Sequence, residues 1–332
     1  MNKNYQIILY GATGFTGKLC AEYFRENYPD LNWAIAGRNK NKLEALKSEL
    51  NLDCDIFVAD SDDYEAIKNF VKQTKVVLSA AGPFARYSTK VVEACVECKT
   101  HYTDITGENH WVKGLIDRFH EKAALDGTRI VPSCGYDSIP SDLGVYFSVT
   151  RSNQPVNHVT VYHSAKGGAS GGTTETMFTM GPLPKEMRDP FLLNPKDSVS
   201  ETQKRKSLDN FSVKPIPGTD AFSGMGLMAF ANTRVVRRSS ALFDLNQKSY
   251  GPDFTFKELG SYPSKAAARI TSFVLMSAFL VIATPLRYLV RPLLPKPGDG
   301  PDKEARDNGW FRGLFIAEPV SYTHLRAHET NQ

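Results

Sequence analysis

The run Gly11-Ala12-Thr13-Gly14-Phe15-Thr16-Gly17 decides the fold of the N-terminal part of this chain. It follows an apolar stretch, Tyr5–Tyr10, and opens a helical pattern, so it joins a strand to a helix. In such a turn the first glycine permits a tight bend, the second lets the backbone approach a pyrophosphate, and the third lets the helix pack on the strand. The start of the helix offers N–H groups and a positive dipole end to the phosphate. The loop residues that we expect at the cofactor are Gly11, Thr13, Gly14, Phe15, Thr16 and Gly17.

Short apolar runs alternate with helical patterns up to about Ser133. The expected strands are Gln6–Tyr10, Trp33–Ala36, Asp55–Val58, Val76–Ala80, His101–Asp104 and Arg129–Val131. The expected helices are Thr16–Asn27, Lys40–Leu50, Asp62–Lys72, Thr89–Cys98 and Asn109–Leu125, with Asn39 and Ser61 at N-cap positions. Alternation of this kind predicts an α/β fold, a doubly wound parallel Rossmann sheet with right-handed crossovers.

The end of the second expected strand indicates which dinucleotide binds. An NAD enzyme usually places an acid there to bind the ribose 2′-hydroxyl. This chain has Arg38 instead, followed by Lys40. A carboxylate would repel a 2′-phosphate, whereas a guanidinium can bind it with two hydrogen bonds. The pattern therefore predicts NADP(H), and the alternative is a solvated loop arginine.

Two more strand ends are candidate cofactor contacts, because ligands of such sheets bind beyond the carboxyl ends of the strands. Asp60 ends the third strand and is a candidate for the adenine edge. The turn after the fourth strand is expected beside the nicotinamide ribose, through Ala81, Gly82 and Pro83. Tyr64 and Lys68 match the Tyr-x-x-x-Lys pair of short-chain dehydrogenases, but they lie on the adenine side, and we interpret them as a chance match.

Composition limits the class of protein. The 332 residues suffice for two domains, which we place at residues 1–150 and 151–320. The net charge of +4 is too small and too dispersed to indicate a nucleic-acid partner. The five cysteines form an odd, uneven set, which favours free thiols in the reducing cytoplasm, and no cleavable signal pattern precedes Tyr5. Cys95 and Cys98 have no second pair to complete a zinc site, so we expect no metal.

Several motifs together resemble one family. They are Gly11–Gly17, Ala36-Gly37-Arg38, Ala81-Gly82-Pro83, Tyr102-x-Asp104-x-x-Gly107-Glu108 and Gly135-Tyr136-Asp137-Ser138-Ile139-Pro140-Ser141-Asp142. In this order they resemble saccharopine dehydrogenase-like oxidoreductases, in the branch that includes the trans-acting enoyl reductases of lipid biosynthesis. The resemblance implies an NADP-linked oxidoreductase of lipid or glycolipid metabolism, associated with membranes. No cluster of arginines in the sequence clearly suits the dicarboxylic adduct of the lysine-pathway enzymes.

The residues after the sixth expected strand are the catalytic candidates, since reacting groups collect at strand ends. Tyr136 is expected to donate the proton that completes the reduction, and Asp137 to orient it or the nicotinamide amide. The alternative is that Asp137 and Asp142 cap the next helix, which we favour for Asp142.

The second half of the chain predicts an α+β domain on the substrate side. A strand is expected at His158–Ser164, followed by a glycine-rich stretch, Lys166–Thr174, that is either a lid over the substrate or nicotinamide or a mobile turn. Ile270–Leu286 carries no charge and is flanked by arginines, so it is either a membrane or lipid contact or a core helix. Ser321–Gln332 resembles translated adapter sequence, and we expect the second domain to be truncated at its C-terminal end.

These observations predict an enzyme in which NADPH delivers a hydride to an enoyl or carbonyl group of a lipid-like intermediate. A saccharopine-type amino-acid dehydrogenase remains an alternative. A non-catalytic, membrane-docked NADPH sensor is another, since it needs the nucleotide motifs but no proton donor. Nothing in the sequence indicates an oligomeric state.

Overall fold

The computed structural model describes residues 3–136, 138–168, 170–180, 188–209, 211–296, 298–320 and 325–326. The chain divides into two compact units. The first unit comprises Met1–Gly135, Ala169–Met180 and Leu293–Gly300, and the second comprises Tyr136–Gly168, Gly181–Pro292 and Pro301–Gln332.

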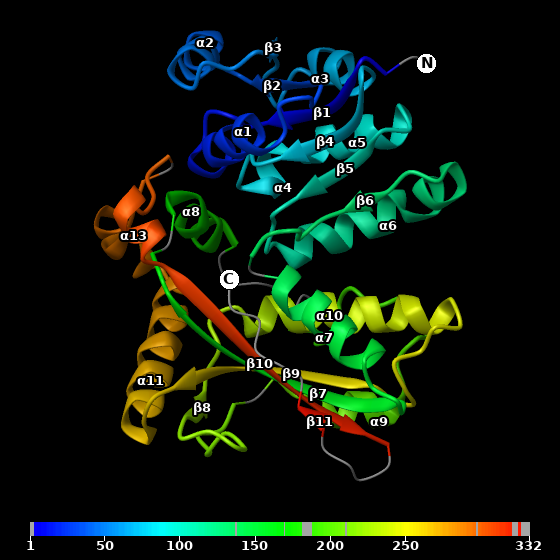
Figure 1. Cartoon of the computed structure of the whole chain (residues 1–332), viewed down its shortest axis with the longest axis vertical. Helices are drawn as coiled ribbons and strands as arrows, with labels where there is room; N and C mark the ends of the chain where they lie inside the picture. The colour runs from blue at the N-terminus through cyan, green and yellow to red at the C-terminus, as the bar shows by residue number, and fades with distance from the viewer. Residues whose placement is uncertain are drawn as a thin grey trace. The chain divides into compact units, whose positions relative to one another are not determined.

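The first unit contains a parallel sheet that has six strands within the described residues (Figure 1). The strands are β1 (Tyr5–Tyr10), β2 (Trp33–Gly37), β3 (Asp55–Val58), β4 (Thr74–Ser79), β5 (His101–Asp104) and β6 (Ile130–Val131). Their order is β3-β2-β1-β4-β5-β6, and every neighbouring pair is parallel. This is the doubly wound parallel sheet predicted from the sequence, and its strand order reverses between β1 and β4, where such sheets bind their ligands.

Helices cover both faces of this sheet. They are α1 (Phe15–Asn27), α2 (Lys40–Glu49), α3 (Tyr64–Val71), α4 (Phe84–Tyr87), α5 (Thr89–Glu97) and α6 (Asn109–Asp126). Successive side chains of β1 point to opposite faces. Leu9 packs in the cluster with α1 and α2, whereas the ring of Tyr10 stacks on Phe70 of α3 with centroids 5.7 Å apart. Both faces of the central strand are therefore buried, which explains its continuous apolar run.

One predicted helix cap is confirmed and another is wrong. Asn39 caps α2, because its side chain accepts the backbone N–H of Lys42 at 3.0 Å. Ser61 does not cap α3. Asp63 does so instead, accepting the N–H of Ala66 at 3.0 Å, because the chain first makes a turn in which Asp60 accepts the N–H of Asp62.

The second unit contains a mixed sheet of order β11-β10-β7-β9-β8 in the described residues. Its strands are β7 (Val156–Lys166), β8 (Phe222–Gly224), β9 (Thr255–Tyr262), β10 (Trp310–Pro319) and β11 (Leu325–Arg326). β7 pairs with β9 in parallel and with β10 in antiparallel orientation. The longer helices of this unit are α7 (Ile139–Thr150), α10 (Ala229–Leu245) and α11 (Lys265–Ile282). Its shorter helices are α9 (Glu201–Lys206), α12 (Arg287–Val290), η2 (Arg291–Leu293) and α13 (Lys303–Asp307), and α8 (Gly171–Met180) belongs to the first unit.

The compact units differ from the sequence-based domains in two respects. The second unit begins at Tyr136, not near residue 150, because α7 packs Val145 into the same apolar cluster as Val236 of α10 and Phe256 of β9. Two segments from the second half return to the first unit, Ala169–Met180 and Leu293–Gly300. Neither return has a signal in local sequence, because it depends on contacts between distant segments.

Candidate functional site

The glycine loop between β1 and α1 has a different physical reason for each glycine. Gly11 has a φ of +82°, and a Cβ there would lie 2.7 Å from the backbone nitrogen of Ala81. A Cβ on Gly17 would lie 2.2 Å from the carbonyl oxygen of Gly11. Both positions therefore need glycine for the fold of the first unit itself.

Gly14 is different, because the protein leaves space beside it. A Cβ there would meet one described atom within 4 Å, the carbonyl oxygen of Gly11 at 3.4 Å, and its φ of −77° is open to any residue. Packing within the chain therefore does not explain this glycine. A pyrophosphate that approaches the backbone at the start of α1 does explain it, so the loop fits a dinucleotide.

Phe15 also belongs to this loop, and a distant segment lies against it. A Cβ on Gly300 would be 2.3 Å from the Phe15 ring, so Gly300 packs directly on the ring. The same segment joins α8, because the N–H of Gly171 donates to the carbonyl oxygen of Asp299 at 2.8 Å. Part of the glycine-rich stretch expected as a lid thus lies in the cofactor-binding unit, and its lid role stays a prediction.

Arg38 lies at the end of β2 beside an aromatic ring. Its guanidinium carbon is 5.7 Å from the ring centroid of Tyr87 on α4, and that of Arg86 is 5.2 Å from the same ring. Both guanidiniums are exposed, and within the described part of the chain neither has a carboxylate partner. Two cations held on one ring attract an anion, and a 2′-phosphate is a dianion of suitable size. The sequence reasoning missed Arg86 and Tyr87, which follow the Gly82-Pro83 turn.

The turn after β4 is held by a buried glutamate from the resemblance motif. Glu108 is 1% exposed and accepts the backbone N–H of Phe84 at 2.7 Å and that of Ala85 at 3.1 Å. These are the first N–H groups of α4, directly after Ala81-Gly82-Pro83. Burial raises the pKa of Glu108, and the two N–H donors oppose that shift. Glu108 therefore fixes the turn where the nicotinamide ribose is predicted.

Asp104 of the same motif fastens the ends of two neighbouring strands. Its carboxylate accepts the N–H groups of Thr106 and Ser133 at 2.9 Å each and the hydroxyl of Tyr102 at 2.8 Å. Burial raises its pKa to about 6. Asp104 and Glu108 hold backbone, so the motif shapes the crevice edge rather than presenting acids to a ligand.

Several sequence-predicted residues have simpler surroundings. Asp60 is exposed at the end of β3 and shapes the turn before α3, and its adenine contact stays a prediction. Thr13 is exposed in the loop. On α3, Lys68 forms an ion pair with Glu97 at 2.8 Å, which agrees with a structural role for that helix.

Tyr136 opens the second unit, and Asp137 lies outside the described residues. The Tyr136 ring is 50% exposed and stands edge-on to Phe311 of β10, with centroids 4.8 Å apart. The Tyr136 phenol is therefore on the surface of its unit, and its role as proton donor stays a prediction.

The rest of this motif points into the second unit. Ser138 donates to the side-chain oxygen of Asn232 at 3.0 Å, and Ser239 donates to Asp142 at 2.9 Å. The predicted cap role of Asp142 is wrong, because its side chain bonds α10 and is not the N-cap of α7, a position that Ser138 occupies. Burial raises the pKa of Asp142 to about 6. The motif therefore anchors α7, and so holds the segment that carries Tyr136.

Ser141 is the centre of a buried polar chain that the sequence did not reveal. Its hydroxyl donates to Glu258 of β9 at 2.6 Å and lies 2.9 Å from Nε2 of His163 on β7. Because the single hydroxyl proton goes to Glu258, the Nε2–H of His163 donates to Ser141. Burial lowers the pKa of His163 to about 4, so the imidazole is neutral. The Ser141 hydroxyl therefore links β7 to β9 through hydrogen bonds inside the second unit.

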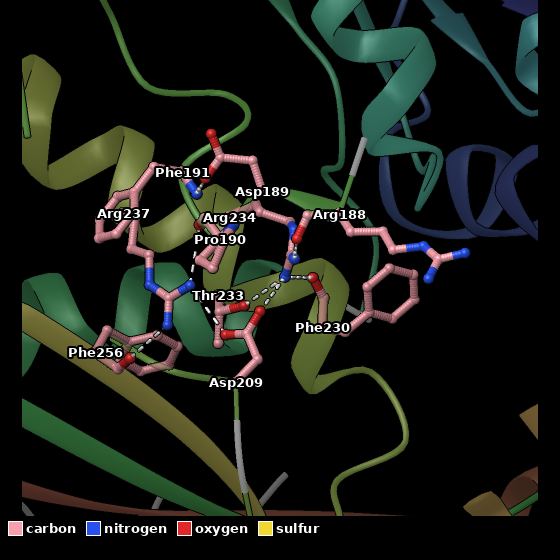
Figure 2. A network of polar contacts seen from close by, with 10 residues as sticks. All are labelled: Arg188, Asp189, Pro190, Phe191, Asp209, Phe230, Thr233, Arg234, Arg237 and Phe256. Carbon is pink, nitrogen blue, oxygen red and sulfur yellow. Dashed lines mark hydrogen bonds and ion pairs between the residues drawn. The ribbon is translucent and has the colours of Figure 1, made fainter. Parts of the chain in front are cut away.

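The second unit holds two neighbouring arginines, but they bind the protein itself (Figure 2). Arg234 and Arg237 of α10 share the carboxylate of Asp209, at 2.7 Å and 3.0 Å. Arg234 also donates to the carbonyl oxygens of Phe230 and Arg188, and Arg237 to those of Pro190 and Phe256. The pair fastens irregular segments to α10, which is a structural role rather than binding of a dicarboxylic substrate.

Comparison with known proteins places the chain beside NADP-dependent enzymes. Residues 7–131 match the saccharopine dehydrogenase NADP binding domain. A Mycobacterium tuberculosis protein provisionally named a trans-acting enoyl reductase is 34% identical over 339 residues, which cover 93% of this chain and 80% of that protein. The trans-acting enoyl reductase of Mycobacterium ulcerans is 32% identical over 342 residues, with the same two coverages of 93% and 80%. Among solved structures, apo histidine-tagged saccharopine dehydrogenase (L-Glu forming) from Saccharomyces cerevisiae has a TM-score of 0.51 at 13% identity, covers 99% of this chain and 85% of that chain, and shares the fold.

Proposed function

Because this chain belongs to the saccharopine dehydrogenase-like family that includes the trans-acting enoyl reductases, we propose that it reduces an enoyl or carbonyl group of a lipid intermediate. The chain is an NADP-dependent oxidoreductase, and its first unit binds NADP(H). The name of the relatives supports the enoyl class. The observation in the chain itself that carries the proposal is the space beside Gly14, which nothing in the described protein fills.

The reaction adds a hydride to one carbon of the double bond and a proton to the other, so that no further reductant is needed. NADPH supplies the hydride and leaves as NADP⁺. The chain has to hold the nucleotide, align the acceptor and provide the proton. We assign proton donation to Tyr136, which has an exposed phenol and a segment held by Ser138, Ser141 and Asp142. The predicted role of Asp137 falls outside the described residues.

A lipid-like substrate is supported by the surface of the second unit. Helix α11 is long and apolar enough to cross a membrane, and 11% of it is buried. The low burial supports the membrane or lipid alternative over the core-helix alternative for Ile270–Leu286. We propose a cytoplasmic enzyme that contacts a membrane through this stretch, where lipid intermediates are held.

The test is transfer of deuterium from NADPD, deuterated at the hydride position, to defined acceptors. The full chain should place one deuterium on the β-carbon of a 2-enoyl thioester and leave the matched saturated thioester unlabelled. A Gly14→Val variant provides the control without cofactor binding. Labelling of a saccharopine-type imine in place of the enoyl thioester would overturn the substrate class. NADPH binding without transfer to either acceptor would favour the non-catalytic sensor.

A further inference from the structure

Helix α11 buries small side chains and exposes large apolar ones, the reverse of an ordinary surface helix. Its residues that are buried against the unit are small, Ala268 and Ser272. Its large apolar side chains face outward, with Phe273 74% exposed and Leu280 62% exposed. Water-exposed apolar surface on this scale is unfavourable in a monomer and indicates a non-aqueous neighbour. The helix therefore lacks part of its natural surroundings.

The exposed apolar residues form one continuous surface. In a helix with 3.6 residues per turn they fall along the side opposite to the small residues. Further exposed apolar residues follow Pro285, in and beside α12. Its large exposed members are Ile270, Phe273, Val274, Met276, Leu280, Leu286, Tyr288 and Leu289. We call this set the apolar foot.

The helix is fixed lengthwise on its unit. Near its middle the hydroxyl of Ser272 accepts the backbone N–H of Met225, the residue after β8, at 2.9 Å. Near its end the ring of Phe279 stands edge-on to Phe230 of α10. At 1.5 Å per residue the helix spans about 27 Å, slightly less than the roughly 30 Å hydrocarbon core. It can therefore present one side to a membrane while it remains packed on the protein.

The charge of this region is one-sided. From Leu259 to Gly298 the sequence has no Asp or Glu and five basic residues, Lys265, Arg269, Arg287, Arg291 and Lys296. The whole chain has a net charge of +4, so the rest of it carries −1. The basic residues precede and follow the uncharged run Ile270–Leu286 in the sequence. These are the positions at which lipid phosphate groups would border an apolar surface that inserts into a membrane.

We propose that the apolar foot and the basic residues of the same unit, Lys265, Arg269, Arg287 and Arg291, dock the enzyme on one leaflet of a membrane that contains anionic phospholipid. The proposal deepens the membrane contact of the proposed function by naming the headgroup charge and the depth of insertion. A second copy of the chain is a poor occupant, because two such surfaces would bring like charges together without an acid between them. An anionic lipid surface satisfies the apolar and the charged groups together.

The test is flotation of the full chain with vesicles of phosphatidylcholine alone or with one third phosphatidylglycerol. The chain should float with the anionic vesicles, and strongly less at high salt. Phe273→Asp with Leu280→Asp should abolish flotation, because both carboxylates would enter hydrocarbon. Leu125→Asp provides the matched control, since Leu125 is 89% exposed on α6 and outside the foot.

Lys265→Gln with Arg269→Gln tests the charge. Each lost charge should weaken binding to anionic vesicles about fivefold, so the pair should weaken it roughly 20- to 30-fold. Lys248→Gln, at an exposed base outside the region, should leave binding unchanged. Equal binding to neutral and anionic vesicles, or a wild type that does not float, would overturn the proposal.

NADPH titration and deuterium transfer to a soluble enoyl thioester keep this outcome separate from that of the proposed reaction. All variants should retain both properties. Loss of flotation together with NADPH affinity in the Phe273/Leu280 variant would mean that the helix is part of the fold. If the wild type sediments as a dimer and the Phe273/Leu280 variant as a monomer, the apolar foot is the interface with a second copy of the chain.

Discussion

The two units use opposite buried charges to hold backbone groups. In the first unit, carboxylates take backbone N–H groups: Asp104 joins the ends of β5 and β6, and Glu108 holds the first turn of α4. In the second unit, guanidiniums take backbone carbonyls: Arg234 and Arg237 hold segments that have no strand partner. The difference follows from which backbone groups lack partners, N–H groups at helix starts and loop turns in one case and loop carbonyls in the other. It teaches that the first unit uses acids to shape a binding edge, whereas the second uses cations in place of secondary structure.

The largest effects are expected in the glycine loop, where one glycine-to-valine substitution should destroy the fold and another should destroy only NADPH binding. Gly17→Val should unfold the first unit, because its Cβ would lie 2.2 Å from the carbonyl oxygen of Gly11. Gly14→Val should remain folded and lose NADPH affinity by about 100-fold or more, a change of about 3 kcal/mol. Thermal melting and NADPH fluorescence titration measure the two effects.

Gly114→Val on α6 is the control for these variants, because a Cβ there would meet no described atom within 4 Å. It should retain both the fold and the affinity, apart from the small cost of a β-branched residue in a helix. A folded Gly14→Val protein with unchanged NADPH affinity would remove the ligand-based reason for this glycine.

The second unit should lose stability when Asp209, the acid shared by Arg234 and Arg237, is removed. Asp209→Ala leaves two buried arginines without the carboxylate between them, and breaking a buried pair costs about 3–5 kcal/mol. We expect the lower end of that range, because the Asp209 side chain is 24% exposed. Urea unfolding measures the change, and Asp220→Ala at an exposed position is the matched control. If both variants unfold alike, the arginines are held by the carbonyls alone.

Arg38 and Arg86 of the first unit should determine the preference for NADPH over NADH. Arg38→Asp should weaken NADPH binding at least tenfold and narrow the preference over NADH, since a charge-assisted hydrogen bond contributes about 1.5–3 kcal/mol. Arg86→Ala should also weaken NADPH binding, but by less, because the Tyr87 ring still supports Arg38. Isothermal titration with both nucleotides tests this. Equal affinity of the unaltered chain for NADPH and NADH would contradict the role of both arginines.

The smallest effect concerns the pH dependence of the second unit. The folded-state pKa of Asp142 is raised from 3.8 to about 6, so its stabilising contribution is present below 3.8 and is lost as the pH rises through about 6. The free energy of unfolding should fall by about 1 kcal/mol per pH unit in this window. Asp142→Asn should flatten that slope, because the amide stays neutral and can still accept the Ser239 hydroxyl. Chemical unfolding at a series of pH values tests it, and an unchanged slope would assign the pH dependence to other groups.

Local sequence rules predicted most of the strands and helices of the first unit. The alternation of strands and helices, the glycine loop and the cap at Asn39 depend on residues a few positions apart, where steric and hydrogen-bond rules are strict. The same rules misplaced the cap of α3 by two residues, because both Ser61 and Asp63 are suitable and the turn made by Asp60 decides between them.

The sequence by itself determined the Rossmann order, the NADP(H) loop and the replacement of an acid by Arg38, since each depends on a pattern within one strand–turn–helix unit. Only the tertiary structure decided that Arg86 and Arg38 flank one ring, that Asp142 bonds α10, and that Arg234 and Arg237 share Asp209. It also placed large apolar side chains of Ile270–Leu286 on the outside of their unit, which composition does not determine, because an apolar helix has the same composition whether its large residues face inward or outward. Burial is a property of contacts between distant segments, and no local pattern contains it.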